Sequence, residues 1–327
     1  MQMRKLGRTG LQVSEVGFGA WAIGGSWGGV TDDDAMATLH AAVDAGVTFI
    51  DTADVYGDGR SERLIGQLLR DRPDVDLTVA TKAGRRLDPH TAEGYNRANL
   101  DAFVDRSLTN LGVQRLDLVQ LHCPPWAVYY RPEIYAAMEA IRDSGKVARW
   151  GVSVEKVEQG LKAITHPVVE TVQIIFNAFR QRPAELFLQQ AAAQDVGVLA
   201  RVPLASGLLT GKMSADTTFA PDDHRNFNRD GESFDVGETF GGVPFDIGLD
   251  AVDQLRPLTD GQPLATFALR WVLSHPEVSS VIPGARRPQQ AVDNAAASAS
   301  GPLKDRQMER ARQVYDELIA KHVHTRW

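Results

Sequence analysis

Apolar runs rich in Val and Ile alternate with segments of helical spacing along this chain of 327 residues. The pattern predicts strands at residues 16–19, 47–53, 77–82, 116–122, 146–153, 168–174, 196–202 and 278–284. It predicts helices at residues 32–45, 61–69, 100–111, 133–144, 157–164, 184–193, 264–273 and 288–297. Strand–helix repetition is typical of an α/β protein with a parallel sheet. Eight units favour a closed (β/α)8 TIM barrel over the alternative, a doubly wound open sheet.

Two further elements flank this repetition. An N-terminal β-hairpin is expected within residues 3–13, and an extra amphipathic C-terminal helix reaches about residue 321. No linker or change of composition divides the sequence, so residues 1–327 are expected to form a single (β/α)8 barrel domain.

Residues 213–247 follow neither the strand period nor the helix period, and they are rich in Gly, Asp and Asn. An irregular segment of this length inside a compact domain is usually a lid or a binding loop. Its five phenylalanines favour a lid over the C-terminal face of the barrel, with a disordered surface insertion as the alternative. These are Phe219, Phe227, Phe234, Phe240 and Phe245.

The overall charge excludes some classes of partner. The formal net charge is -7, which argues against nucleic acid and against anionic membranes as partners. No apolar stretch approaches the ~18 residues of a membrane span, and no apolar region typical of a signal peptide follows the N-terminus. Cys123 is the only cysteine, so an internal disulfide is impossible. We expect a cytoplasmic protein.

Three successive predicted strands carry polar residues at their ends. These are Asp51, with Tyr56 five residues later, then Lys82 and His122. Each alone has an ordinary structural explanation, but the ends of neighbouring barrel strands lie together, and that is where barrel enzymes place catalytic groups.

This combination suits the donation of a proton to a carbonyl oxygen. A lysine ammonium lowers the pKa of a neighbouring tyrosine, an aspartate fixes the lysine, and a neutral histidine orients the substrate oxygen. No activated Ser or Cys suggests acyl transfer, and no pair of His ligands ends an early strand as a zinc site would require.

Five segments resemble the aldo-keto reductase family, and they follow the family's order. They are GVTFIDTADVYGDGRSERLIGQLL (46–69), VATK (79–82), LDLVQLH (116–122), VPLASGLLTGK (202–212) and IPGARRPQQAVDN (282–294). The resemblance implies a catalytic tetrad of Asp51, Tyr56, Lys82 and His122. It also implies direct hydride transfer between NADPH/NADP+ and a small carbonyl substrate, with no metal.

The resemblance also implies a set of cofactor-binding positions, to which Asp51 belongs. Gly19, Ala20 and Trp21 match the segment near the nicotinamide ribose, and Ser153 and Gln173 the positions that hold the carboxamide. Leu204, Ser206, Gly207, Leu208 and Lys212 match the pyrophosphate loop. Gly284, Arg286, Arg287, Gln290, Asp293 and Asn294 match the adenosine-phosphate end, where the two arginines suit the 2′-phosphate of NADPH.

Two positions depart from the family pattern. Val154 stands where the family usually has Asn, which removes one expected carboxamide contact. Arg201 stands where an aromatic ring usually stacks on the nicotinamide. Its charge is expected to disfavour the cationic oxidised cofactor relative to the neutral reduced one. Two alternatives remain open, namely pairing of Arg201 with a carboxylate and binding of an anionic substrate.

Substrate-binding residues are expected on the same face of the barrel. They are Trp21, Tyr56, His122, Trp27 and Trp126, although packing at the rim explains the tryptophans equally well. Besides a carbonyl reductase, two functions are considered, namely a cofactor-binding regulatory subunit like the channel-associated members of the family, and a metal-dependent barrel hydrolase. The sequence specifies neither the substrate nor the oligomeric state.

Overall fold

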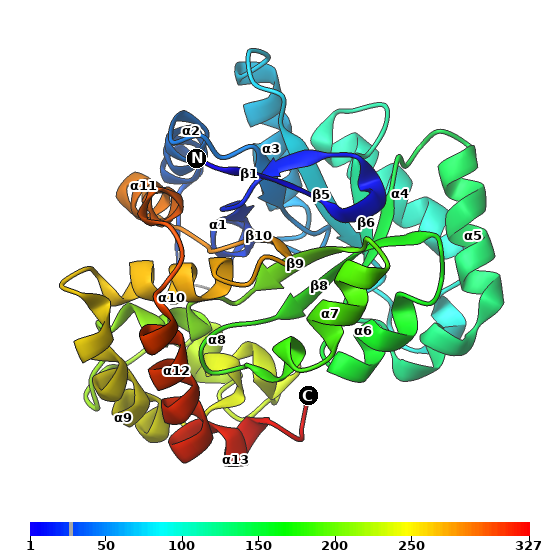
Figure 1. Ribbon diagram of the computed structural model, residues 1–327. Helices are drawn as coiled ribbons and strands as arrows, with labels where there is room; N and C mark the ends of the chain where they lie inside the picture. Colours follow the sequence, from blue (N-terminus) through cyan, green and yellow to red (C-terminus); the bar gives the residue numbers. More distant parts are fainter. Residues whose placement is uncertain (26–28) are drawn as a thin grey trace.

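Eight parallel strands form the centre of the protein in a computed structural model that describes residues 1–25 and 29–327 (Figure 1). The strands are β3 (Phe18–Gly19), β4 (Phe49–Asp51), β5 (Thr78–Ala83), β6 (Leu118–His122), β7 (Trp150–Ser153), β8 (Val169–Ile175), β9 (Gly197–Arg201) and β10 (Val278–Val281). They pair in chain order. Parallel bridges from Val16 to Val281 and from Gly19 to Gly284 join the first strand region to the last. The predicted barrel is confirmed.

The helices follow the strands as expected. They are α1 (Trp21–Gly24), α2 (Asp32–Asp44), α3 (Arg60–Asp71), α4 (Arg97–Leu111), α5 (Pro132–Asp143), α6 (Val157–Ala163), α7 (Phe187–Ala193), α8 (His224–Phe227), α9 (Phe245–Leu255), α10 (Leu264–Leu273), α11 (Pro288–Ala296), α12 (Asp305–Val314) and α13 (Ala320–Val323). A π-helical turn, Tyr315–Ile319, joins α12 to α13, so the predicted C-terminal helix is also confirmed. No described helix is long and apolar enough to cross a membrane.

The N-terminal hairpin closes one end of the barrel. Strands β1 (Met3–Lys5) and β2 (Gln12–Ser14) pair antiparallel, as predicted. Leu6 and Val13, both fully buried, join a small apolar cluster with inward-facing residues of the strands, such as Phe49 and Leu118. A larger apolar core fills the space between the strands and the surrounding helices. Because the hairpin closes one end of the barrel, we expect a ligand site at the other end.

Two local predictions were wrong. Helix α7 begins at Phe187, because Pro183 lies inside a separate 3-10 turn, Arg182–Ala184. Helix α9 was not predicted, although its buried positions Gly248, Ala251, Val252 and Leu255 have helical spacing. Gly248 lies in the interior of this helix, where glycine is usually unfavourable, but a Cβ there would strike the side chain of Leu208.

A buried acid lies in the loop after β4. Asp54 is 0% exposed, and burial, reinforced by the neighbouring carboxylate of Glu62, raises its pKa to about 7. The folded protein therefore retains a proton on Asp54 at pH values where the unfolded chain has released it. Asp54 therefore lowers the free energy of unfolding progressively as the pH rises from near 4 to about 7. Above that range the decrease is complete.

We expect Asp54→Asn to remove this pH dependence. Urea unfolding of the wild type and the variant at about pH 5 and about pH 8 tests this, and the variant should gain stability relative to the wild type at the higher pH by on the order of a few kcal/mol. If the free energies of unfolding of the wild type and the variant differed by the same amount at both pH values, Asp54 would already be ionised in the folded protein at about pH 5.

Candidate active site

A cavity of about 530 Å³ opens at the C-terminal ends of the strands. It is lined by most of the residues that the sequence analysis assigned to a site, namely Gly19, Trp21, Asp51, Tyr56, His122, Ser153, Gln173, Arg201, Leu204, Ser206, Gly207, Lys212, Gly284, Arg286, Gln290, Asp293 and Asn294. Ala20, Lys82 and Leu208 are buried without lining it, whereas Arg287 and Trp126 are exposed away from the lining. Trp27 falls outside the described residues.

Lys82 connects the predicted tetrad. Its ammonium is fully buried and donates to Asp51 Oδ2 at 2.6 Å, to the carbonyl of Thr52 at 2.8 Å and to the hydroxyl of Tyr56 at 3.3 Å. The ring of His122 meets that of Tyr56 edge-on, with centroids 6.0 Å apart. The structure thus brings all four residues together.

Two glutamine amides hold the other oxygen of Asp51. Gln173 Nε2 donates to Asp51 Oδ1 at 2.7 Å, and Gln120 Nε2 donates to the same atom at 3.1 Å. Sequence analysis assigned Gln173 to the cofactor and missed Gln120. The period of the strand gives a signal for Gln120, because it lies two residues before His122 and therefore faces the same side.

Burial determines the protonation of the two rings. It raises the pKa of Tyr56, and Asp51 and Glu238 add to this effect while Lys82 opposes it. Lys82 lowers the pKa of Tyr56 as predicted, but burial has the larger effect, so the pKa is raised overall. Burial, together with the charges of Arg85, Lys82 and Arg201, holds the pKa of His122 well below its ordinary value. At neutral pH the site presents a protonated phenol beside a neutral imidazole.

The ammonium remains charged. Burial alone lowers the pKa of Lys82, but the carboxylate of Asp51 and the oxygen of Tyr56 outweigh that effect and raise it. The buried pair keeps its two charges because each has a partner of opposite sign at hydrogen-bond distance.

Arg201 pairs with a carboxylate of the lid. Its Nη1 lies 3.6 Å from Glu238 Oε1, and its Nη2 donates to the carbonyl of Val154 at 3.1 Å. Arg85 Nη1 donates to the same Glu238 oxygen at 2.9 Å. Of the two alternatives left open for Arg201, the structure shows the pairing with a carboxylate. Its buried Nε lacks a hydrogen-bond partner among the described residues.

The segment 213–247 covers the cavity and forms short helices. Met213, Arg225 and Glu238 from this segment line the cavity, and Phe234 lies 5.9 Å from the ring of Trp21. The predicted lid is confirmed, and the alternative of a disordered insertion is wrong. Glu238 was missed because its importance depends on two arginines distant in sequence.

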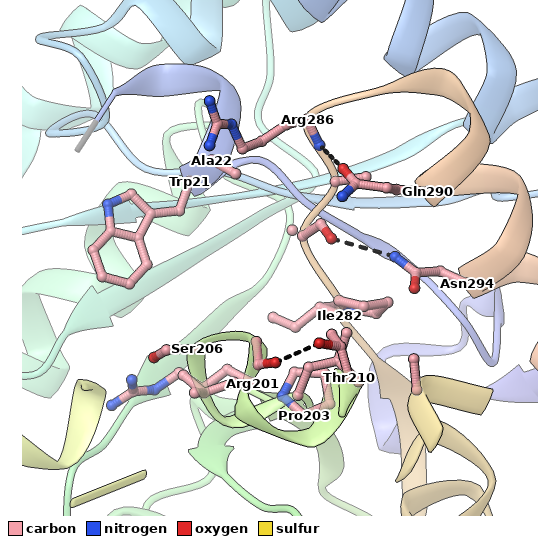
Figure 2. Close-up of a pocket in the computed structure, with 18 of the residues that line it drawn as sticks. Trp21, Ala22, Arg201, Pro203, Ser206, Thr210, Ile282, Arg286, Gln290 and Asn294 are labelled. Carbon is pink, nitrogen blue, oxygen red and sulfur yellow. Dashed lines mark hydrogen bonds between the residues drawn. The ribbon is translucent and has the colours of Figure 1, made fainter. Parts of the chain in front are cut away.

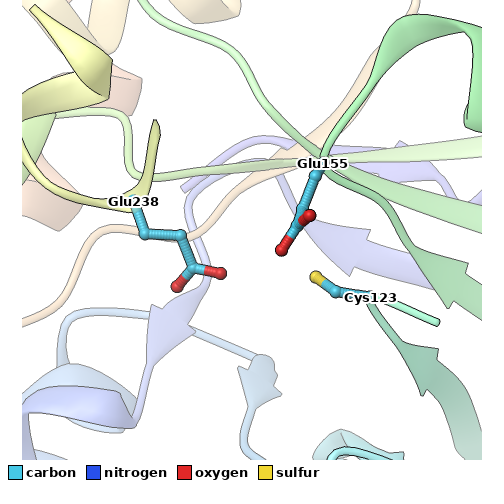
Figure 3. Close-up of side chains that lie close together, drawn as sticks. All are labelled: Cys123, Glu155 and Glu238. Carbon is cyan, nitrogen blue, oxygen red and sulfur yellow. The ribbon is translucent and has the colours of Figure 1, made fainter. Parts of the chain in front are cut away.

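A group that offers ligand atoms for a cation adjoins the same place. Cys123 Sγ and the carboxylates of Glu155 and Glu238 lie within 4.8 Å of one another (Figure 3). Two guanidinium groups already engage Glu238, and burial raises the pKa of Cys123 to about 11 and that of Glu155 to about 7. A cation would compete with both guanidiniums and with these protons, so we do not assign a metal site here.

The other end of the cavity carries the residues that the resemblance matched to the adenosine-phosphate end, among them Arg286, Gln290 and Asn294 (Figure 2). Arg286 precedes α11, Gln290 lies in its first turn and Asn294 in its last turn, and all three line the cavity. The backbone N–H of Arg286 donates to Gln290 Oε1 at 2.8 Å, and Asn294 Nδ2 donates to the carbonyl of Gly284 at 3.3 Å. Arg286 lines the cavity, and its Nη2 donates to the carbonyl of Gly29 at 3.3 Å, whereas the adjacent Arg287 does not line the cavity.

The loop between the two ends has an unusual backbone. Val202, Ala205 and Ser206 have φ values of 54°, 46° and 54°, and Gly207 has a φ of 94°. Left-handed conformations are strained for residues other than glycine, above all for valine. The loop therefore holds a shape fixed by its surroundings, as expected for a loop that wraps a ligand.

Comparison with known proteins gives one consistent result. The model of the Aldo/keto reductase family matches residues 15–316. An aldo-keto reductase of Bacillus subtilis, YhdN, is 34% identical over 89% of this chain and 86% of its own length. A protein of Oryza sativa subsp. japonica named as a probable voltage-gated potassium channel subunit beta is 34% identical over 93% of both chains. The structure of a glycerol dehydrogenase from Gluconobacter oxydans, 32% identical, superposes with a TM-score of 0.77 over 98% of this chain and 96% of its own.

Proposed function

The chain belongs to the aldo/keto reductase family, and from this premise we propose that it reduces an aldehyde or ketone to an alcohol with NADPH. The observation that carries the proposal is the contact of the buried Lys82 ammonium with Asp51 and with the hydroxyl of Tyr56, both of which line the cavity. A protonated phenol in this position donates a proton to a carbonyl oxygen.

Each residue of the tetrad has a distinct task in this proposal. Tyr56 gives its proton to the substrate oxygen, and Lys82 stabilises the phenolate that results. Asp51 keeps the ammonium in place, helped by Gln120 and Gln173. Neutral His122 orients the carbonyl oxygen towards Tyr56. The nicotinamide cofactor, when bound, supplies the hydride that the carbonyl carbon receives.

The donor set of the cavity fits such a cofactor. Arg201 Nε and His122 Nδ1 are buried polar atoms without a partner among the described residues, both in side chains that line the proposed nicotinamide end. At the other end, Arg286 offers a guanidinium suited to a 2′-phosphate. We therefore assign the cofactor as NADPH rather than NADH. We propose direct reduction without a metal.

The substrate would lie between Trp21, Tyr56 and His122, which line the cavity together. Trp126 is 43% exposed and packs on Tyr129 and Tyr130, which favours a role at the rim. The relative from Gluconobacter oxydans is a glycerol dehydrogenase, which is consistent with a small polar carbonyl compound as the substrate.

A second candidate function is a cofactor-binding regulatory subunit. The similarity to the rice protein named as a probable channel subunit favours it. The assembled tetrad favours the enzyme, because a subunit that only binds a cofactor needs no buried ammonium beside a phenol.

Replacement of Tyr56 by Phe tests the proton donor. The variant lacks only the hydroxyl, so kcat should fall by roughly 10²–10⁴ while the affinity for NADPH barely changes. Steady-state assays under conditions where chemistry limits the rate, with cofactor titration by fluorescence, give both quantities. A nearly normal kcat would remove Tyr56 from the mechanism.

Replacement of Arg286 by Ala tests the choice of cofactor. A charged hydrogen bond contributes about 1.5–3 kcal/mol, so the affinity for NADPH should fall roughly 10–150-fold while that for NADH stays nearly constant. Arg287→Ala is the matched control, because this neighbouring arginine is exposed and does not line the cavity.

The control should leave both affinities close to those of the wild type. Equal losses of NADPH and NADH affinity in Arg286→Ala would mean that the arginine is structural. Tighter binding of NADH than of NADPH by the wild type would contradict the cofactor assignment itself.

A further inference from the structure

One turn of the lid, residues 235–242, packs on Trp327. The indole Nε1 of Trp327 donates to Asp235 Oδ1 at 2.8 Å, and the same oxygen accepts from the backbone N–H of Gly237 at 2.7 Å. The ring is 4% exposed and lies against Gly237 and Gly242, where a Cβ would approach ring atoms to 2.9 Å and 2.6 Å. The turn and the ring therefore fit closely because both positions are glycine.

Arginines secure the ring from other directions. The guanidinium of Arg180 lies 4.2 Å from the ring centroid and donates to the carbonyl of Gly241 at 3.1 Å. Arg182 Nη1 donates to the backbone carbonyl of Trp327 at 2.6 Å. Trp327 is thus held by residues that follow β8, and it holds the turn in its place.

The opposite side of the same turn carries Glu238 into the active site. Its carboxylate lies between Arg85 and Arg201, and its carbonyl accepts from Ser206 Oγ at 3.0 Å. Ser206 Oγ also accepts from the backbone N–H of Phe240 at 3.1 Å. The turn therefore connects Trp327 to the proposed nicotinamide and pyrophosphate positions.

We propose that Trp327 is a positioning residue that keeps Glu238 on Arg201 and thereby sets the relative affinity of the cavity for oxidised and reduced cofactor. This proposal rests on the proposed function, since it requires a nicotinamide cofactor in the cavity. Oxidised nicotinamide is a cation and reduced nicotinamide is neutral, so the guanidinium of Arg201 opposes only the oxidised form. The carboxylate of Glu238 reduces this repulsion as long as the turn keeps the carboxylate beside Arg201.

The test is the ratio of the dissociation constants of NADP+ and NADPH, obtained by fluorescence titration. Glu238→Gln removes the offsetting charge and should raise the ratio by about 3–10-fold, as expected for a partly screened charge. Trp327→Ala should also raise the ratio. Trp327→Phe keeps a ring against the two glycines and should recover part of the change. Titrations at about pH 9 keep Glu155 ionised in the wild type and in the variants, because its pKa of about 7 is raised in part by Glu238 and falls when that charge is removed.

A double-mutant cycle separates positioning from general stability. If Trp327 acts through Glu238, then Trp327→Ala adds nothing to the ratio in the Glu238→Gln background. His324→Ala is the matched control, because His324 contacts Tyr315 and Glu185 rather than the turn, and it should leave the ratio unchanged.

Three results would overturn the proposal. They are an unchanged ratio in Trp327→Ala, an equal rise in His324→Ala, and a further rise when Trp327→Ala is added to Glu238→Gln. All three presuppose that the wild type binds NADP+ and NADPH, so a wild type that binds neither would instead contradict the proposed function.

Discussion

The buried ion pair of Lys82 and Asp51 is the interaction on which the active site depends. An ammonium and a carboxylate out of contact with water are costly unless every remaining donor and acceptor has a partner. Here the partners are the carbonyl of Thr52, the amides of Gln120 and Gln173, and the hydroxyl of Tyr56. These groups come from β4, β5, β6 and β8 and the loop after β4, which only a closed barrel brings to one point.

A second group of charged side chains lies on the side of the site that the lid covers. Arg85 and Arg201 lie at the ends of barrel strands, and the lid supplies Glu238 between them. Burial lowers the pKa of His122, and the charges of the two guanidiniums and of Lys82 lower it further, which keeps that imidazole neutral. In the proposed reaction, these positive charges would favour the negative charge that develops on a carbonyl oxygen. The lid supplies the carboxylate of Glu238, which partly offsets the charges of Arg85 and Arg201.

The sequence predicts the parts of this protein that depend on local pattern. Strand and helix periods predict the barrel, and the residues that end three strands predict the tetrad. The pairing of Arg201 with Glu238 could not be predicted, because it depends on how a lid without periodicity folds over the barrel. The raised pKa of Tyr56 was also missed, since burial exceeds the effect of Lys82 and only the structure shows how deep the site lies. Arg286 and Arg287 have equal chemistry in sequence, and only the start of α11 separates their directions.

The central claim is that the protein catalyses the reduction of a carbonyl compound in this cavity and does not only bind a cofactor there. The most direct measurement mixes protein loaded with NADPH with a broad panel of aldehydes and ketones and follows the loss of reduced nicotinamide in a single turnover. The account predicts that at least one small polar carbonyl compound oxidises the bound cofactor, with one alcohol formed for each cofactor consumed. NADPH that binds tightly yet remains reduced across the whole panel would contradict it and favour a regulatory subunit.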